Sequence, residues 1–431
     1  MAIDFKRAPG DLARVVLIAA VSLGACACSG GEGDIGEGDI GEGDIDGSDA
    51  LASVDPLNLV PRLGEPTVVV PSAGLPEAVS PQNANNNLDV CYHQGRTFLA
   101  FRSAPLHFAS ADTELFVVSS VDEVDWRFEG RFAMGTDLRE PRLLSWHGEL
   151  HLYFGRLGDD PAAFEPGQAF HSRWLGEAQW TAPEAFEVPT FIPWRVRGVG
   201  DEAWLIGYSG GEQVYEASDK PTIDIRMLAS ADGLSWHPAA GGDSAVVHTG
   251  GGSEADFALL DDGSLVFVVR NEAGEDGHFG SLVCRAPADD LAAWTCATDP
   301  RKYDSPLVFR AAGRVWLVGR RHVTADGHYD LGGEGPPSKR YQDNLVAYWT
   351  KPKRCSLWQV DPTSLTVEWV IDLPSKGDTC FASILPRDDA GLAWRLYNYS
   401  SPWQGDDEPT WVVGQLGPTL IYRVDLDFGP P

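Results

Sequence analysis

The sequence predicts an all-β protein, a six-bladed β-propeller in which similar sheets surround a central channel. One unit, two apolar strands joined by a short turn, recurs about every 50 residues along most of the chain. Alternating, β-branched and aromatic residues mark these strands, and no stretch of the folded part shows a convincing helical period. Repeats of this kind cannot bury their apolar faces alone, so a radial array of sheets is the expected architecture.

The repeat supplies the inner hairpin of each expected blade. The six hairpins span residues 88–102, 139–156, 193–209, 254–270, 303–321 and 378–399. The segment 60–70 is expected to complete the last sheet beside the C-terminal strand 420–424, because the two ends of the chain must close the ring. The third hairpin has the weakest pattern, and if it is not a blade the alternative is a five-bladed propeller.

A second pattern follows several hairpins and predicts tight turns between outer strands. The pattern S-x-D-x-x-x-W occurs at 120–126 and at 230–236, and its second half, D-x-x-x-W, occurs at 290–294. An aspartate in such a turn accepts hydrogen bonds from backbone N–H groups, while the tryptophan packs between blades. The pattern resembles the Asp box of the sialidase-like β-propellers. This resemblance covers most of residues 86–425 and implies a sialidase-like fold.

The N-terminus has the features of an export signal. Basic residues precede an apolar run at 15–25 that is too short to span a bilayer as a permanent helix. The run ends in Leu23-Gly24-Ala25-Cys26, which resembles the bacterial lipobox. Residues 1–25 are therefore predicted to be a lipoprotein signal peptide, with Cys26 as the lipidated residue. An ordinary signal peptide cut near Ala25 or Ala27 is the alternative.

An acidic, glycine-rich tether is expected at residues 26–55, before a propeller domain at 56–431. GEGDI occurs three times in succession at 31–45, and glycine with regularly spaced carboxylates cannot bury a core. The chain is thus expected to be exported and anchored to a bacterial membrane, in the cell envelope or at the cell surface, through its lipid alone. The formal net charge of −30 argues against nucleic acid as a partner.

The cysteines suggest disulfides and no zinc site. Cys284 and Cys296 are 12 residues apart, and an exporting compartment permits a bridge between them. Their spacing fits no zinc pattern, so no metal-binding residue and no cofactor are predicted. A structural calcium ion among the channel carboxylates is left open. Cys91 and Cys380 occupy equivalent positions in the first and sixth units, which suggests a second bridge across the seam of the ring.

Carboxylates and arginines recur where the channel is expected to open. The acids stand near the starts of the inner strands, at Asp89, Glu140, Glu254 with Asp256, Asp304 and Asp378. The arginines stand at the ends of the second strands, at Arg102, Arg156, Arg270, Arg320 and Arg321. If both sets meet at one mouth, they can hold and cleave a sugar. Alternatively, they form salt bridges that join neighbouring blades.

The sialidase resemblance implies roles for some of these residues. Sialidases hold the substrate carboxylate with three arginines, which would come from Arg102, Arg270, Arg320 and Arg321. A tyrosine attacks the sugar, and the best match is Tyr399, with Glu254 or Glu272 as its partner. Asp89 would be the acid/base, and the remaining acids Glu140, Asp304 and Asp378 would contact substrate. The family's arginine-isoleucine-proline motif is missing, because residues 87–91 read NLDVC.

Three functions therefore follow from the sequence. The first is a sialidase-like propeller that binds or hydrolyses carbohydrate, as an exo-acting glycoside hydrolase on acidic sugars if it is catalytic. The second comes from a resemblance of Arg139-Glu140-Pro141-Arg142 to an element of five-bladed furanosidases, in which Asp89 would be the base and Glu140 or Glu254 the acid. The third is a non-catalytic propeller that binds a glycan, a glycoconjugate or a protein.

Overall fold

The computed structural model describes residues 59–212, 214–215 and 220–431. The predicted signal peptide, the lipidation site Cys26 and the whole of the predicted tether lie outside these residues. Within them, no helix is both long and apolar enough to cross a membrane.

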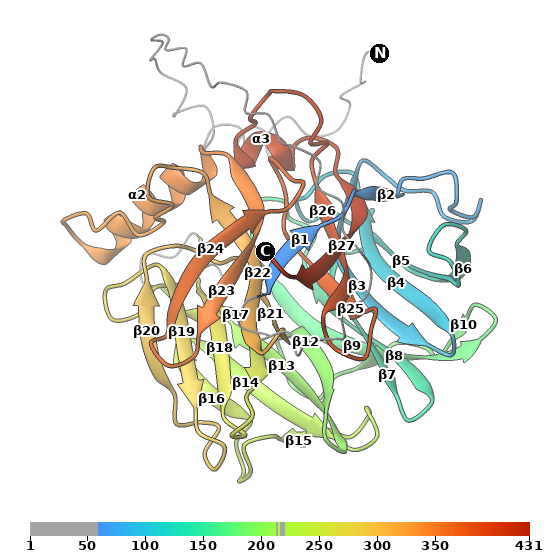
Figure 1. Ribbon diagram of the computed structural model, residues 1–431, viewed down its shortest axis with the longest axis horizontal. Coiled ribbons are helices and arrows are strands. Elements are labelled where there is room, and N and C mark those ends of the chain that lie inside the picture. Colours follow the sequence, from blue (N-terminus) through green and yellow to red (C-terminus); the bar gives the residue numbers. More distant parts are fainter. Residues whose placement is uncertain (1–58, 213, 216–219) are drawn as a thin grey trace, which may run out of the picture.

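Six sheets, counted over the described residues, stand around a common centre (Figure 1). Blade 1 contains β3 (Ala84–His93), β4 (Arg96–Ala104), β5 (Glu114–Ser120) and β6 (Arg127–Phe132). Blade 2 contains β7 (Leu138–Trp146), β8 (Glu149–Leu157), β9 (Pro166–Gly176), β10 (Gln179–Trp180) and β11 (Glu184–Ala185). Blade 3 contains β12 (Phe191–Val199), β13 (Glu202–Gly210), β14 (Ile223–Ser230), β15 (His237–Pro238) and β16 (Val246–Gly250).

The second half of the chain forms the other three blades. Blade 4 contains β17 (Gly252–Leu259), β18 (Leu265–Asn271), β19 (Ser281–Ala286) and β20 (Thr295–Asp299). Blade 5 contains β21 (Leu307–Ala311), β22 (Arg314–His322), β23 (Lys353–Asp361) and β24 (Thr366–Asp372). Blade 6 contains β25 (Ser383–Pro386), β26 (Ala393–Ser400), β27 (Leu420–Gly429), β1 (Val60–Leu63) and β2 (Thr67–Val70).

The two ends of the described chain close the ring, as the sequence predicted. Strands β1 and β2 both pair antiparallel with β27, with Leu63 opposite Leu426 and Thr67 opposite Arg423. The six predicted hairpins are all present as the first two strands of the blades. The third hairpin forms its own sheet with β14 and β15, so the five-bladed alternative was wrong.

Within the part of the chain that the structure describes, two helices interrupt the all-β pattern. α2 (Pro337–Trp349) lies between the second and third strands of blade 5, and α3 (Trp411–Gln415) lies at the same place in blade 6. The sequence was expected to show no helical period, and this was wrong for α2. Its buried side chains Tyr341, Leu345 and Tyr348 are four and then three residues apart, as on one face of a helix. The signal was weak because the rest of this helix is polar and only proline marks its start.

The predicted tight turns lie between the third and fourth strands of blades 1, 3 and 4. In the second turn the Asp232 carboxylate accepts hydrogen bonds from the N–H groups of Leu234 and Ser235, both at 2.8 Å. These bonds lower the pKa of Asp232 to about 2. Trp236, which ends this turn, packs edge-on against Tyr153 of blade 2. The turn therefore helps to join two blades.

Two disulfides are present among the described residues, and one differs from expectation. Cys284 is bonded to Cys296 within blade 4. Cys380 is bonded to Cys355 of blade 5, with a Cα–Cα distance of 4.9 Å, while Cys91 is free. The expected bridge between Cys91 and Cys380 was therefore wrong. The physical reason is orientation: the Cys91 side chain packs into the core between blades 1 and 2, on the side away from blade 6.

Candidate active site

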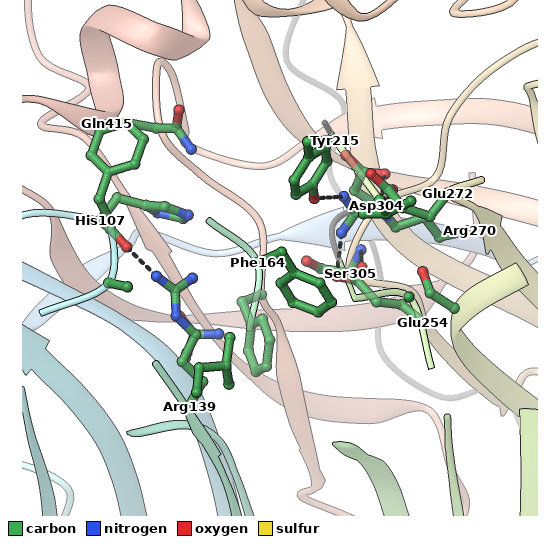
Figure 2. A pocket seen from close by; sticks show the side chains of 18 of the residues that line it. His107, Arg139, Phe164, Tyr215, Glu254, Arg270, Glu272, Asp304, Ser305 and Gln415 are labelled. Atoms are coloured by element: carbon green, nitrogen blue, oxygen red, sulfur yellow. Dashed lines mark hydrogen bonds and ion pairs between the residues drawn. The ribbon is translucent and has the colours of Figure 1, made fainter. Parts of the chain in front are cut away.

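One face of the propeller gathers the variable parts of every blade. The sheets are antiparallel, so the starts of the first strands, the ends of the second strands and the connections from second to third strands share a face. A cavity of about 230 Å³ opens there. The second-to-third connections of all six blades line it, through His107, Phe164, Tyr215, Glu272, Tyr348 and Trp411. Figure 2 shows several of these side chains converging.

Irregular backbone directs side chains of the inner strands into the cavity. The pairing register shifts at Asn86/Leu88 of β3, at Arg139/Arg142 of β7 and at Gly252/Ala255 of β17. Such a bulge leaves a residue unpaired and turns its side chain. The residues at these points, Asn87, Glu140 and Glu254, all line the cavity. Asn87 and Glu140 have φ angles of 40° and 54°, which residues other than glycine rarely adopt.

A compact ion-pair network forms one wall of the cavity (Figure 2). The Arg270 guanidinium pairs with Glu254 and Glu272 and lies 3.2 Å from Asp304 Oδ1. Asp304 Oδ2 lies 2.8 Å from Arg320 Nη1. Burial alone would raise the pKa of Asp304, but the neighbouring cations, with Arg270 the strongest, lower it to about 2. Asp304 therefore stays ionised and links blade 4 to blade 5.

The cations of this wall are already balanced by carboxylates. Lys302 Nζ lies 3.0 Å from Glu272 Oε2, so three basic side chains face Glu254, Glu272 and Asp304. Arg139, on the other side of the cavity, pairs with Asp137 at 2.5 Å. Each cavity arginine thus has a carboxylate partner. An anionic ligand would have to share a guanidinium rather than meet a free one.

A second hydrogen-bonded group contains Tyr399. Its hydroxyl donates to Asp378 Oδ1 at 2.9 Å, and Asp378 Oδ2 lies 2.8 Å from Nδ1 of His107. Burial and the Asp378 charge raise the pKa of Tyr399 well above its ordinary value. The expected partners of this tyrosine, Glu254 and Glu272, bind Arg270 instead. Asp378 is therefore the carboxylate positioned to take the Tyr399 proton.

Glu140 is the cavity carboxyl with the weakest ion pairing. Asn87 Nδ2 donates to its Oε1 at 2.9 Å, and the nearest guanidinium nitrogen, on Arg142, is 3.8 Å from Oε2. Burial is the largest influence, and it raises the pKa of Glu140 to about 7. Glu140 is thus partly protonated at neutral pH and can donate a proton, as a general acid must.

Apolar, mostly aromatic side chains line the cavity on two sides. α2 and α3 contribute Leu345, Tyr348, Trp349, Trp411 and Val412. On the floor, Phe381 lines the cavity, and the buried Arg142 guanidinium lies 4.5 Å from the centre of its ring and 5.0 Å from that of Trp194. Side chains therefore fill the central channel at this level, and the site is a partly open pocket with a closed floor. Apolar walls with a few placed polar groups are typical of small-ligand sites.

The structure brings most of the predicted site residues together. Those that line the cavity are Glu140, Glu254, Glu272, Asp304, Arg270, Arg320 and Tyr399. Asp378 lies directly behind Tyr399, through the hydrogen bond described above.

Two of the predicted acids lie elsewhere. Asp89 accepts hydrogen bonds from Leu143 N at 2.8 Å and Ser383 Oγ at 2.6 Å, so it joins blades 1, 2 and 6. Asp256 repeats this arrangement toward Val308 N of blade 5, at 2.6 Å. These two acids are architectural, because their oxygens are used by neighbouring blades.

Three of the predicted arginines also do not line the cavity. Arg156 lies 5.8 Å from the centre of the Phe170 ring, within blade 2. Arg102 is fully buried against Asp137 and donates to the carbonyl oxygen of Phe108. Arg321 pairs with Asp372 within blade 5 and does not line the cavity. Of the arginines expected to hold a substrate carboxylate, Arg270 and Arg320 therefore line the cavity. Arg139 is the third arginine there.

Sequence reasoning missed several cavity residues. His107, Phe164 and Tyr215 lie in second-to-third connections that differ from blade to blade, and Lys302 lies between blades 4 and 5, so none of them gave a repeating signal. Arg139 stood beside a predicted acid and could have been chosen on that basis. Among the described residues, no group of three or more His, Cys, Asp or Glu side chains could hold a metal ion.

Comparison with known proteins supports the fold. No protein-family model matches the chain, and no curated protein sequence does. The Trypanosoma rangeli sialidase in complex with sialic acid is a similar structure, with TM-score 0.50 and 12% identity over 80% of this chain and 54% of that one. The phage phi92 endosialidase has TM-score 0.51 and 9% identity over 81% and 68%.

A Penicillium chrysogenum α-L-arabinanase complexed with arabinobiose has TM-score 0.48 and 11% identity over 84% and 98%. The chain thus spans about half the length of the sialidase that it resembles. At these identities the two sialidase likenesses show the fold, a six-bladed sialidase-like β-propeller.

The contacts of Asp89 generate a test of its architectural role. Asp89→Asn places an amide donor against the donor N–H of Leu143 or the hydroxyl of Ser383. We expect the free energy of unfolding to fall by about 2 kcal/mol in urea titrations, while any ligand binding by the folded protein is unchanged. Asp243→Asn, at an exposed bend, is the matched control. Equal stability of both variants would show that Asp89 does not join the blades.

Proposed function

We propose that this protein is an exo-acting glycoside hydrolase that removes a terminal sugar from a glycan. The observation that carries the proposal is the hydrogen bond from Tyr399 to Asp378 at the edge of a cavity that also contains Glu140, Arg270 and Arg320. A pocket with a closed floor admits the end of a glycan chain more readily than its middle. The sialidase-like fold supports the proposal, because the structural neighbours named above include sialidases.

Tyr399 is the proposed nucleophile. Because its pKa is raised well above the ordinary value, it attacks as a phenol that loses its proton to Asp378 Oδ1 as the new bond forms. The bond from the tyrosine oxygen to the anomeric carbon forms while the glycosidic bond breaks. In the second step water attacks the anomeric carbon and gives a proton to the Glu140 carboxylate. The bond between that carbon and the tyrosine oxygen breaks, and Tyr399 regains its proton from Asp378.

Glu140 is the proposed general acid, in place of Asp89. The acid protonates the leaving oxygen, and a carboxyl with a pKa of about 7 is partly protonated at neutral pH, as a general acid that works there must be. Asp89 cannot take this role because both of its oxygens are bound by neighbouring blades.

We further propose that the sugar carries an acidic group, held by Arg270, Arg320 and Arg139. Guanidinium groups bind carboxylates in a planar, two-pronged geometry. A tyrosine nucleophile suits such a substrate, because a carboxylate nucleophile would be repelled by the negative charge of the sugar's acidic group.

A second candidate is a non-catalytic glycan-binding module. The specific observation in its favour is that every cavity arginine already has a carboxylate partner. The two candidates differ in outcome: a binding module retains labelled glycans on an array and releases no sugar from them.

We propose that the activity takes place outside the cytoplasm, on the basis of the anchor that the sequence predicts. Fatty acid attached to Cys26 would hold the propeller at a membrane, with residues 26–55 as spacer. When the bacterial host is fed an alkyne fatty acid, we expect the wild-type protein to become labelled and the Cys26→Ser variant to remain unlabelled. Labelling of the variant, or export without labelling of either chain, would contradict the anchor.

Hydrolysis itself is tested with fluorogenic glycosides of sialic acid, hexuronic acids and neutral sugars. We expect one acidic glycoside to be cleaved, and Tyr399→Phe and Glu140→Gln each to lower kcat/KM by ~10²–10⁴-fold. Tyr397→Phe is the matched control, because Tyr397 lies on the same strand and does not line the cavity. Full activity of Tyr399→Phe would contradict the proposed nucleophile, and cleavage of neutral sugars alone would contradict the acidic substrate.

The pKa of Glu140 predicts how stability changes with pH. Its folded-state pKa of about 7 lies above the ordinary value of 4.5, so the folded protein binds the extra proton and loses stability as pH rises between these values. Glu140→Gln removes this loss. We expect the variant to be more stable than the wild type by ~1–3 kcal/mol at pH 8 and equal at pH 4.5.

Glu272→Gln is the control for this pH dependence. Its carboxylate has a lowered pKa because Arg270 and Lys302 outweigh the effect of burial, so its replacement should destabilise the protein at pH 8. A Glu140→Gln variant that is less stable than the wild type at pH 8 would contradict the raised pKa.

A further inference from the structure

His107 is the one member of the Tyr399 group that the proposed reaction does not use. It lies in the connection between β4 and β5 of blade 1, whereas Asp378 and Tyr399 belong to blade 6. Its side chain is 16% exposed and lines the cavity. A hydrogen bond that crosses the seam of the ring to reach a proposed proton acceptor suggests a role in the chemistry.

The chain of contacts is continuous. His107 Nδ1 lies 2.8 Å from Asp378 Oδ2, and Asp378 Oδ1 accepts from the Tyr399 hydroxyl at 2.9 Å. Asp378 is completely buried, and its backbone N–H and carbonyl are held by Ser401 at 3.1 and 2.8 Å. Each carboxylate oxygen therefore has one defined partner, and the carboxylate cannot rotate without breaking both contacts.

The surroundings favour neutral His107 with its proton on Nδ1. A carboxylate oxygen can only accept, so Nδ1 must donate and Nε2 carries the lone pair. Arg139 donates to the His107 carbonyl oxygen at 2.6 Å, and Arg139 and Arg102 both disfavour an additional positive charge. Burial lowers the pKa of His107 most, these two arginines act in the same direction, and Asp378 opposes them. The rings of Phe108 and Trp411, which contact the imidazole edge-on, carry no charge.

We propose that His107 is a positioning residue that acts through Asp378, and that its neutral form is required for turnover. The inference rests on the proposed function of Tyr399. As the tyrosine oxygen bonds to the anomeric carbon, the tyrosine proton moves to Asp378 Oδ1 and the leaving oxygen takes the Glu140 proton. His107 keeps its own proton and holds Asp378 in place throughout.

The proposal has a consequence for the acid side of the pH profile. An imidazolium at His107 would form a full ion pair with Asp378 and make that carboxylate a weaker proton acceptor. The activity should therefore fall as pH drops through the lowered pKa of His107, whereas loss of the Glu140 proton sets the alkaline side. The apparent pKa values of the two limbs belong to the group of interacting residues as a whole. Substitutions can show which residue determines each limb.

Two substitutions test the inference through activity. His107→Asn keeps an N–H donor for Asp378 but cannot titrate, and His107→Ala removes the donor. We expect His107→Ala to lower kcat/KM by about 100-fold, and His107→Asn to retain most activity and lose the acid limb. His237→Asn, at an exposed outer strand, is the control. An unchanged acid limb in His107→Asn, or equal loss in both variants, would overturn the proposal.

A measurement without substrate separates this inference from the proposed function. Nitrogen NMR of histidine-labelled protein, with the signal assigned by its loss in His107→Asn, reports the tautomer and the pKa of His107. We expect a neutral ring protonated on Nδ1 at pH 7 and a pKa that changes in Asp378→Asn and in Tyr399→Phe. If neither variant changes the pKa of His107, the inference is overturned, even if Tyr399→Phe is inactive. If the variants do change this pKa but the protein hydrolyses no glycoside, the proposed function is wrong instead.

Discussion

The ion pairs of Asp304 are the interaction on which the cavity depends. This buried carboxylate contacts Arg270 of blade 4, Arg320 of blade 5 and the hydroxyl of Tyr348 in α2. A buried charge without a partner is very costly, so the positions of two arginines and the roof helix are fixed together. Removing one partner would leave the others unbalanced. The wall of the cavity is therefore stiff, and the same carboxylates that stiffen it compete with any anionic ligand for the arginines.

Acids near the starts of the inner strands serve two purposes, and their partners tell them apart. Asp89 and Asp256 accept backbone N–H groups of the following blade, which satisfies donors that a curved, irregular inner strand would otherwise leave unpaired. Glu140 instead sits on a bulge, receives one amide hydrogen bond and faces the cavity with a pKa of about 7. The acids that join blades are those that repeat along the chain. The acid that faces the cavity is the one at which regular strand pairing is interrupted.

The predictable part of the structure is the part that repeats. Six hairpins and the ring closure follow from apolar alternation, because every blade must bury both faces against its neighbours. The site was less accessible to this reasoning. A one-residue bulge decides which side chain faces the cavity, so Asp89 was placed in the site although Glu140 takes the proposed role. His107 lies in a connection that occurs once, where no periodicity could identify it. The helical spacing of α2 was a weak signal, because most of this helix is polar.

The central claim is that Tyr399 attacks the sugar. Incubation with fluorinated glycosyl donors, whose electron-poor ring slows release of the covalent intermediate, followed by peptide mass spectrometry, tests it most directly. The account predicts a glycosyl adduct on the peptide that contains Tyr399, and none in the Tyr399→Phe variant. An adduct on Glu140, Glu254 or Glu272, or turnover of the substrate with no adduct at any side chain, would contradict it.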